Sequence, residues 1–229
     1  MSLAHSPRIV TDGLVLCLDA GNTKSYPGSG TTWTDLSGNG NNGTLVNGVG
    51  FDGGNGGSLS FDGVNDYVNL GTSLTNGYIN ISVSIWCYIT SNNGNNTLEL
   101  VTKYPGGNGW IVRYLVDINK FSVQGREDGT LFINIPSSST YSINNWYNVV
   151  FTKNASNWRL YINSSLDADT NIDSGTVPFN NNGILSIASI PTFNFYSKSN
   201  IAQVSIYNRA LTASEVQQNF NATRSRYGI

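Results

Sequence analysis

Charged residues are scarce in this chain of 229 amino acids. They make up 11% of the sequence, whereas an average soluble domain carries about 25%. Solubility therefore depends largely on amide and hydroxyl side chains. The lysines and arginines, 12 in total against 14 acidic residues, are scattered singly. Because a protein that follows phosphate backbones needs a basic stripe or patch, the sequence argues against nucleic acid as a partner.

Long hydrophobic runs are also missing. No apolar segment approaches the roughly 20 residues that span a bilayer, and we expect no membrane insertion. The first ten residues, MSLAHSPRIV, lack the basic region and the following apolar stretch of a secretory signal. We therefore expect synthesis in the cytoplasm, with export by a route other than a cleaved signal as the alternative.

Cysteine and histidine are rare as well. The two cysteines, Cys17 and Cys87, each lie in an apolar run. This placement favours two buried free thiols and leaves one disulfide as the alternative. The single histidine, His5, lies near the start of the chain. The sequence thus offers neither a Ser-His-Asp arrangement nor an HExxH zinc helix.

Glutamate occurs only three times. Glycoside hydrolases need two carboxyl groups that flank one glycosidic bond. Glu215 belongs to a predicted helix cap, Glu127 lies in the turn sequence REDG, and Glu99 stands alone in a strand. For Glu99 we expect an exposed edge or rim position, and for Glu127 a solvated charge. The sequence therefore predicts that the protein is not an enzyme, and glycoside hydrolysis is the poorer alternative.

Short apolar runs separated by glycine and asparagine fill most of the chain. Residues 80–89, NISVSIWCYI, alternate strictly between two faces, which is typical of a half-buried strand. About a dozen such strands with turn residues between them favour an antiparallel β-sandwich and argue against βαβ units. The predicted strands are 11–19, 44–46, 58–61, 67–70, 80–89, 98–104, 110–116, 120–124, 131–135, 146–153, 158–163, 184–188 and 201–207.

One helix is predicted near the end of the chain, at about residues 212–222. Thr212 and Glu215 have the spacing of a capping box, in which each side chain binds the other residue's backbone N–H. Leu211 and Val216 are placed to form a hydrophobic staple. Phe220 lies one turn further along the same face, so this helix has a narrow apolar stripe to pack on the sandwich.

These motifs resemble the laminin-G-like, concanavalin A-like lectin/glucanase superfamily. The resemblance rests on FDGVNDYV, NWYNVVFTKNASNWRLYIN and YNRALTASEV and extends from about Asp12 to Phe220. It implies an all-β jelly-roll sandwich of two antiparallel sheets with a short C-terminal helix. We expect an N-terminal arm at 1–10 and a single domain at 11–229, whose C-terminal tail is 223–229.

The two ends of the chain resemble virion structural proteins of tailed phages, of the cyanophage type. These ends are HSPRIVTDGLVLCLDAGN and RSRYGI. The resemblance implies a non-catalytic capsid- or tail-associated protein that contacts other virion proteins or copies of itself. The arm would dock elsewhere, and the location would be the virion or, alternatively, extracellular. The alternative function is a carbohydrate-binding module that recognises cell-surface polysaccharide.

Four aromatic residues outside regular alternation are the candidate ligand contacts. Trp110 follows the flexible turn PGGNG, and Phe193, Phe195 and Tyr196 lie in a segment with weak strand character. Such residues can present apolar surface to a glycan or another partner. Tryptophans inside alternating strands are expected in the core instead.

No cofactor is required by the sequence, and calcium is the one alternative considered. Relatives in this superfamily often hold Ca²⁺ through oxygen ligands in rim loops. Asp62, Asn65 and Asp66 form the candidate cluster, although a tight turn between two strands calls for the same residues. Asp19 and Asn22 in LDAGN form a second, weaker candidate.

Overall fold

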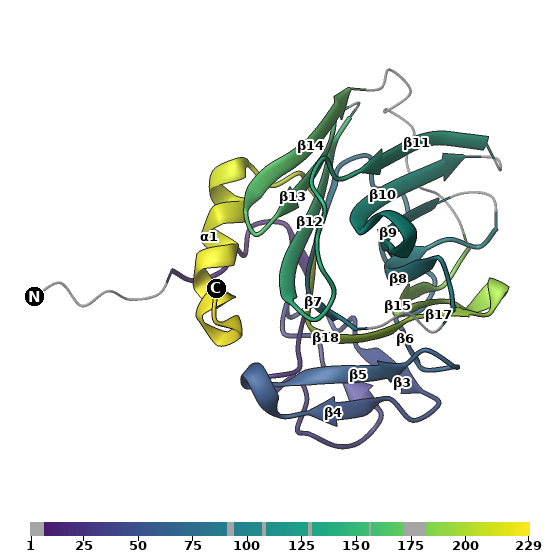
Figure 1. Cartoon of the computed structure of the whole chain (residues 1–229). Helices are drawn as coiled ribbons and strands as arrows, with labels where there is room; N and C mark the ends of the chain where they lie inside the picture. Colours follow the sequence, from purple (N-terminus) through teal and green to yellow (C-terminus); the bar gives the residue numbers. More distant parts are fainter. Residues whose placement is uncertain (1–6, 91–93, 107–108, 128–129, 156, 172–181) are drawn as a thin grey trace, which may run out of the picture.

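The computed structural model describes residues 7–90, 94–106, 109–127, 130–155, 157–171 and 182–229. Over these residues two large antiparallel sheets face each other, and one α-helix lies near the C-terminus (Figure 1). This arrangement confirms the predicted all-β sandwich with a short C-terminal helix. Neither α1 nor any other helix in the described part of the chain has the length and apolarity to cross a bilayer.

The first sheet carries the strand that sequence alternation identified most clearly. Its strands are β1 (Leu14–Asp19), β4 (Gly50–Asp52), β5 (Ser58–Asp62), β7 (Ile81–Ile89), β12 (Trp146–Asn154), β13 (Asn157–Ile162), β14 (Ser165–Asn171) and β18 (Lys198–Tyr207). They run in the order β14-β13-β12-β7-β18-β5-β4, and β1 pairs with the later part of β18.

The second sheet runs in the order β11-β10-β9-β8-β15-β6-β3-β2. Its strands are β2 (Thr32–Trp33), β3 (Gly43–Val46), β6 (Tyr67–Asn69), β8 (Thr97–Lys103), β9 (Gly109–Leu115), β10 (Lys120–Glu127), β11 (Thr130–Pro136) and β15 (Leu185–Ile187). Smaller elements are the hairpin strands β16 (Ser189–Ile190) and β17 (Phe195–Tyr196) and the 3₁₀ helices η1 (Gly54–Gly56), η2 (Val116–Ile118), η3 (Pro191–Phe193) and η4 (Arg224–Tyr227).

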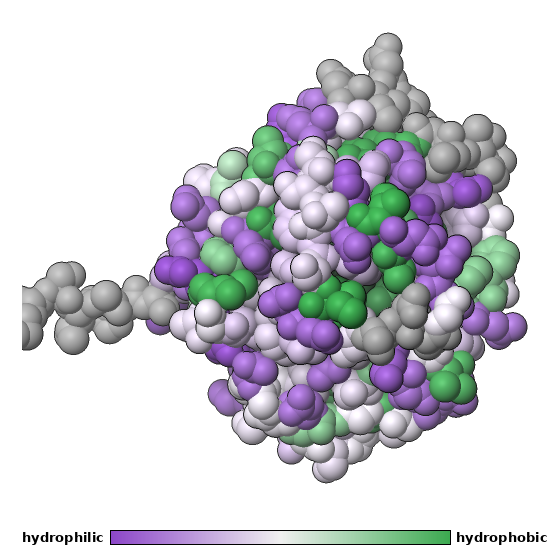
Figure 2. All heavy atoms as spheres, viewed as in Figure 1, coloured by the Kyte–Doolittle hydropathy of each residue, from purple (hydrophilic) through white to green (hydrophobic). Residues whose placement is uncertain are grey.

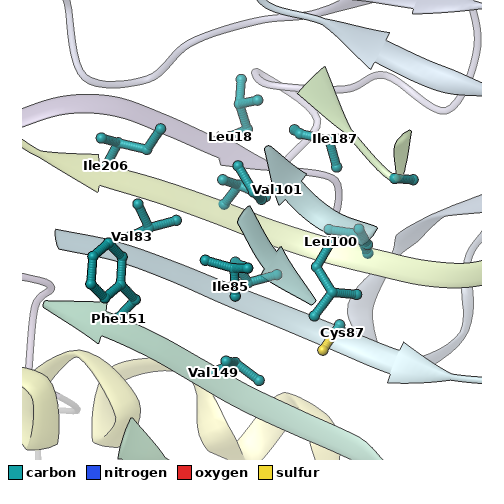
Figure 3. Packing of buried hydrophobic residues seen from close by; sticks show 14 of the residues in the cluster. Leu18, Val83, Ile85, Cys87, Leu100, Val101, Val149, Phe151, Ile187 and Ile206 are labelled. Carbon is teal, nitrogen blue, oxygen red and sulfur yellow. The ribbon is translucent and has the colours of Figure 1, made fainter. Parts of the chain in front are cut away.

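The main core lies between the two sheets. Val83, Ile85 and Cys87 of β7 point toward Leu100 and Val101 of β8 (Figure 3), and all five are fully buried. The period-two pattern thus placed the correct face of β7 inward. Cys87 forms no disulfide, and Cys17 is likewise a free, buried thiol. Of the two alternatives, the structure supports free thiols.

The helix α1 (Ala213–Thr223) begins at the predicted capping box. The backbone N–H of Glu215 donates to Thr212 Oγ1, and the N–H of Thr212 donates to Glu215 Oε2 at 2.8 Å. Arg209 donates two hydrogen bonds to the Glu215 carboxylate, at 2.6 and 2.9 Å, and this contact lowers the pKa of Glu215 to about 2. Leu211 and Val216 are buried in one cluster, as the staple predicts.

The helix covers the outer face of the first sheet, where it buries Trp86 (Figure 1). The indole of Trp86 stacks on Tyr227 with ring centroids 3.9 Å apart and lies 5.7 Å from the Phe220 ring. The expectation that β7 is half-buried is therefore wrong at Trp86, because residues after the last strand fold back over it. On the face opposite the core, Ser82 and Trp86 are buried, and Ser84 and Tyr88 are half-buried.

Part of the predicted N-terminal arm packs on the same helix. The backbone N–H of Val10 donates to Asn219 Oδ1 at 2.8 Å, and Tyr207 Oη donates to the Val10 carbonyl at 3.0 Å. Val10 is buried. The end of the 1–10 arm is thus fixed to the body of the domain, and docking of the rest of the arm elsewhere stays a prediction. Residues 1–6 lie outside the described residues.

Candidate functional site

A groove of about 220 Å³ lies on the face of the second sheet that points away from the core. Strands β8, β9 and β10 form its floor, and the β16–β17 hairpin forms one side. Pockets that enclose a drug-sized ligand measure about 300–1,000 Å³. This groove is smaller, so it fits one end or one unit of a longer ligand.

The polar floor arises from strand alternation and from one β-bulge. Leu98 and Leu100 point into the core, and Glu99 between them points into the groove. Glu99 pairs with Arg113 on β9, and the register shifts by one residue before Val101 pairs with β9. Because of the bulge at Leu100, the two residues after Glu99, Leu100 and Val101, both point into the core. Glu99 itself lies opposite Arg113.

Glu99 is 3% exposed, so the expectation of an exposed edge or rim position is wrong. Thr97 Oγ1 donates to Glu99 Oε1 at 2.8 Å. Glu99 Oε2 is buried and has no hydrogen-bond partner among the described residues. Burial raises the pKa of Glu99 above its ordinary value, while the charge of Arg113 and the Thr97 hydrogen bond act in the opposite direction.

Arg113 and Gln124 extend the polar floor across the next two strands. Gln124 is 4% exposed, and Arg113 is half-buried. Arg113 Nε is buried without a hydrogen-bond partner in the described part of the chain. An unpaired buried polar group costs about 1–3 kcal/mol. Glu99 Oε2 and Arg113 Nε are two such groups on one groove, and a ligand bound there can pair with both.

The pKa of Glu99 leads to a stability prediction. Because its folded-state pKa is raised, unfolding exposes a carboxyl group that ionises more readily, and the wild-type protein loses stability as pH rises above about 4.5. We expect Glu99→Gln to raise the free energy of unfolding by about 1–2 kcal/mol at pH 7, with little change at pH 4. Urea unfolding of both proteins at several pH values measures this difference.

Glu215→Gln is the matched control, and we expect it to change the free energy of unfolding at pH 7 in the opposite direction. The pKa of Glu215 is lowered to about 2, so its stabilising contribution is present above about 4.5 and is lost as pH falls toward 2. Glu215→Gln should therefore destabilise the protein at pH 7 and become neutral in acid. A Glu99→Gln effect of the same size at every pH would show that Glu99 ionises as it does in water.

The aromatic side of the groove comes from the β16–β17 hairpin. Phe193 and Phe195 line the groove and are 45% and 42% exposed. The Phe193 ring stacks beside Tyr104 with centroids 5.8 Å apart. Between the two phenylalanines, Asn194 adopts the left-handed conformation at φ 54°, which closes the turn.

Hydrogen bonds hold this hairpin beside β8. Thr102 Oγ1 donates to the Ser189 carbonyl at 2.7 Å, and Ser186 Oγ donates to the same oxygen at 2.8 Å. All three residues are buried. The exposed phenylalanines are thus carried by a turn that is anchored to the floor of the groove.

Two of the four predicted aromatic contacts do not line the groove. Trp110 is fully buried in the main core, so the expectation that it presents apolar surface to a partner is wrong. Its position on β9 faces inward, together with Val112 and Tyr114. Tyr196 is half-buried, and its ring packs 6.2 Å from that of Tyr67.

The candidate calcium residues form a tight turn. Asp62 Oδ1 accepts from the backbone N–H of Val64 at 2.7 Å and of Asn65 at 3.4 Å. Asp66 is 3% exposed, its Oδ2 accepts from the N–H of Asp62, and burial raises its pKa. Over the described ranges, no group of three or more His, Cys, Asp or Glu side chains is placed to hold a metal ion. Calcium binding here stays a prediction.

The second candidate pair is used for structural contacts. Both carboxylate oxygens of Asp19 accept hydrogen bonds from Arg226, at 2.8 and 2.9 Å. Asn22 Oδ1 accepts from the backbone N–H of Lys24 at 3.0 Å. Since Asp19 is already paired with a cation, the expectation of a metal ligand at this position finds no support in the geometry.

The fold and the groove define a lectin-like β-sandwich, and comparisons with known proteins agree. The family model for the concanavalin A-like lectin/glucanases superfamily matches residues 61–217. The chain belongs to this superfamily. A search of curated protein sequences finds no significant match.

Three solved structures illustrate the similarity of fold. The binding domain of Paraclostridial Mosquitocidal Protein 1 has a TM-score of 0.74 at 22% identity, over 93% of this chain and 52% of that one. The ligand binding domain of botulinum neurotoxin serotype D, in complex with N-acetylneuraminic acid, has a TM-score of 0.71 at 15% identity, over 92% and 51%.

The third is domain 4 of AbnA, an extracellular arabinanase from Geobacillus stearothermophilus, in complex with arabinotriose. It has a TM-score of 0.69 at 14% identity, over 90% of this chain and 97% of that one. This chain therefore spans about half the length of the toxin binding domains but nearly all of the arabinanase domain. At these identities the similarity concerns the fold alone.

Proposed function

We propose that the protein is a non-catalytic carbohydrate-binding domain that holds one or two sugar units of a polysaccharide in the groove. The observation that carries this proposal is an exposed aromatic pair, Phe193 and Phe195, beside a buried polar floor with unpaired groups. A sugar ring has an apolar face that packs on aromatic rings, and its hydroxyl groups pair with carboxyl, amide and guanidinium groups. Ligand sites generally combine such apolar walls with a few fixed polar groups.

Two of the similar structures contain saccharides, N-acetylneuraminic acid in one and arabinotriose in the other. They support a saccharide as the class of ligand. The face of the molecule seen in Figure 2 shows hydrophobic residues in small, separate patches among hydrophilic ones. A large apolar patch would favour docking to another protein instead.

Binding is favoured over hydrolysis by the groove's carboxyl groups. Glycoside hydrolysis needs two of them, about 5–10 Å apart depending on the mechanism. Within the described residues, Glu99 is the one carboxyl group that lines the groove. The side chain of Glu127 lies outside the described residues. Hydrolysis remains the alternative, since one similar structure is a domain of an arabinanase.

The setting of the domain is a separate part of the proposal. The resemblance at the two chain ends supports a surface protein of a tailed-phage virion that contacts host glycans, with an extracellular binding module as the alternative. The groove does not depend on this setting. Binding can therefore be tested with the isolated protein.

A glycan array followed by titration calorimetry tests the binding proposal. We expect the wild-type protein to bind at least one polysaccharide, and the double variant Phe193→Ala, Phe195→Ala to bind about tenfold more weakly or worse, because the aromatic wall is lost. Phe51→Ala is the matched control, since Phe51 is 41% exposed and lies outside the groove. It should bind as the wild type does.

Two additional measurements test the roles of calcium and of hydrolysis. Binding that EDTA removes would assign a role to calcium. Release of reducing sugar from a bound polymer, lost in Glu99→Gln, would replace binding by hydrolysis. No binding to any glycan would contradict the proposal and favour a purely structural role.

A further inference from the structure

The charge of the groove is opposite to that of the protein. The whole chain has a net charge of -2. Among the residues that the structure describes, the charged groups that line the groove are two arginines, Arg113 and Arg126, and one carboxyl group, that of Glu99. These described lining residues carry a net positive charge even with Glu99 ionised. A concave site of one sign concentrates ligands of the opposite sign.

Resting on the proposed carbohydrate-binding function, we infer that the groove selects acidic saccharides and that Arg113 binds the carboxylate of a uronic or sialic acid unit. A guanidinium presents its donors as a planar fork that matches a carboxylate. Arg113 Nε is one such donor, and it is buried without a hydrogen-bond partner among the described residues.

The position of Arg113 is fixed by its neighbours. It lies opposite Glu99 on β8 and opposite Ser122 on β10, so backbone hydrogen bonding on both sides holds its strand. Glu99 attracts Arg113 electrostatically, but the two side chains form no direct ion pair in the described structure. Arg113 is thus held in position without an ion pair to Glu99, and a ligand carboxylate can pair with its guanidinium group.

Glu99 can pair with a ligand in either protonation state. Burial raises the pKa of Glu99, while the charge of Arg113 and the Thr97 hydrogen bond act in the opposite direction. A protonated carboxyl group also donates a hydrogen bond, and Glu99 Oε2 has no partner among the described residues. A sugar hydroxyl would satisfy that oxygen, because a hydroxyl donates to an ionised carboxylate and accepts from a protonated one.

Arg126 adds a second positive charge to the lining of the groove. Its guanidinium carbon lies 6.0 Å from the centroid of the Tyr104 ring, within the range of a cation–π contact. Tyr104 in turn stacks on Phe193. The aromatic wall and the cationic floor therefore meet at Tyr104, where the sugar ring would pack while its carboxylate reaches Arg113.

A matched pair of ligands tests this inference without any variant. Oligogalacturonate carries a carboxylate on every ring, and its methyl ester keeps the same rings without the charge. We expect calorimetry to show at least about tenfold tighter binding of the acid, with a preference that shrinks as salt rises. Sialyllactose against lactose repeats the comparison with a different acidic sugar.

Two variants assign the preference to Arg113. Arg113→Gln should lose the preference for the acid, so that its affinity for the acid falls further than its affinity for the neutral ligand, and Arg113→Lys should keep part of the preference because the charge remains without the fork. Arg159→Gln is the control, since Arg159 lies on the other sheet with its side chain 41% exposed and paired with Asp169. Circular dichroism checks that each variant is folded.

The outcomes separate this inference from the function on which it rests. Equal binding of acid and ester, or tighter binding of a sulfated sugar, would overturn the acidic-saccharide inference and leave carbohydrate binding intact. An acid preference that survives in Arg113→Gln would overturn the role of Arg113. Absence of binding to every saccharide would overturn both proposals.

Discussion

Replacement of Trp86 by alanine is expected to lower the free energy of unfolding by about 4 kcal/mol. The indole is 1% exposed and lies between the outer face of β7 and the rings of Phe220 and Tyr227. Its Nε1 donates to Thr223 Oγ1 at 2.9 Å. Alanine would leave a cavity under the helix and remove the hydrogen bond to Thr223 Oγ1, whose hydroxyl keeps only its bond to the Asn219 carbonyl, and both effects are destabilising.

Urea unfolding and amide hydrogen exchange measure this effect. Beyond the global loss, we expect α1 to exchange faster, because a helix of 11 residues is marginal in water without tertiary contacts. Tyr88→Ala is the matched control, since Tyr88 is a half-buried aromatic on the same face, 5.5 Å from the Trp146 ring. It should cost about 1–2 kcal/mol. A loss below about 1 kcal/mol for Trp86→Ala, with α1 still protected, would show that other contacts hold the helix.

The case of β7 shows what a local pattern can predict. Alternation has a period of two residues, so it separates Val83, Ile85 and Cys87 from their neighbours without knowledge of the rest of the fold. It identified the core face correctly. Whether the other face is exposed depends on which segment covers it, and for Trp86 that segment lies more than a hundred positions further along the chain. Sequence alternation carries no information about that distance.

The helix cap was predictable for the same reason. Thr212 and Glu215 bond to each other's backbone over three positions, and every partner in the capping box is local. The hairpin phenylalanines are an intermediate case. Weak strand character suggested that Phe193 and Phe195 are accessible, and they are exposed, but their position beside Glu99 depends on the anchoring of the hairpin to β8.

The polar floor of the groove was not predicted from the sequence, although the alternation of residues along β9 and β10 contained part of the information. Gln124 and Arg126 alternate with core residues on β10 and therefore share one face. Trp110, Val112 and Tyr114 alternate in the same way on β9, and this pattern could have placed Trp110 in the core. The pairing of Glu99 with its partner strand depends on register and on the bulge at the following residue. Neither property is encoded locally.

Replacing Gly21 by alanine is expected to lower the free energy of unfolding by about 3 kcal/mol, although Gly21 is exposed. A Cβ atom at this position would lie 1.7 Å from the Gly56 carbonyl oxygen and 2.0 Å from Arg226 Nη2. The first contact is with backbone and cannot be relieved by a rotamer change. Relief of the second would displace Arg226 from Asp19, to which it donates hydrogen bonds at 2.8 and 2.9 Å. The substitution must therefore shift the η1 loop away from the end of β1.

The matched control is Gly53→Ala in the same loop. Gly53 has a φ of −77°, and a Cβ atom at this position would lie 4.0 Å from its nearest neighbour, a ring carbon of Phe51. Alanine there should change the free energy of unfolding by no more than about 0.5 kcal/mol. Arg226→Ala separates the two contacts, because it removes the ion pair with Asp19 and the hydrogen bond from Arg226 to the Gly56 carbonyl without adding a Cβ atom at position 21. If Gly21→Ala were no worse than Arg226→Ala in urea unfolding, the backbone contact with Gly56 would not be the source of the cost.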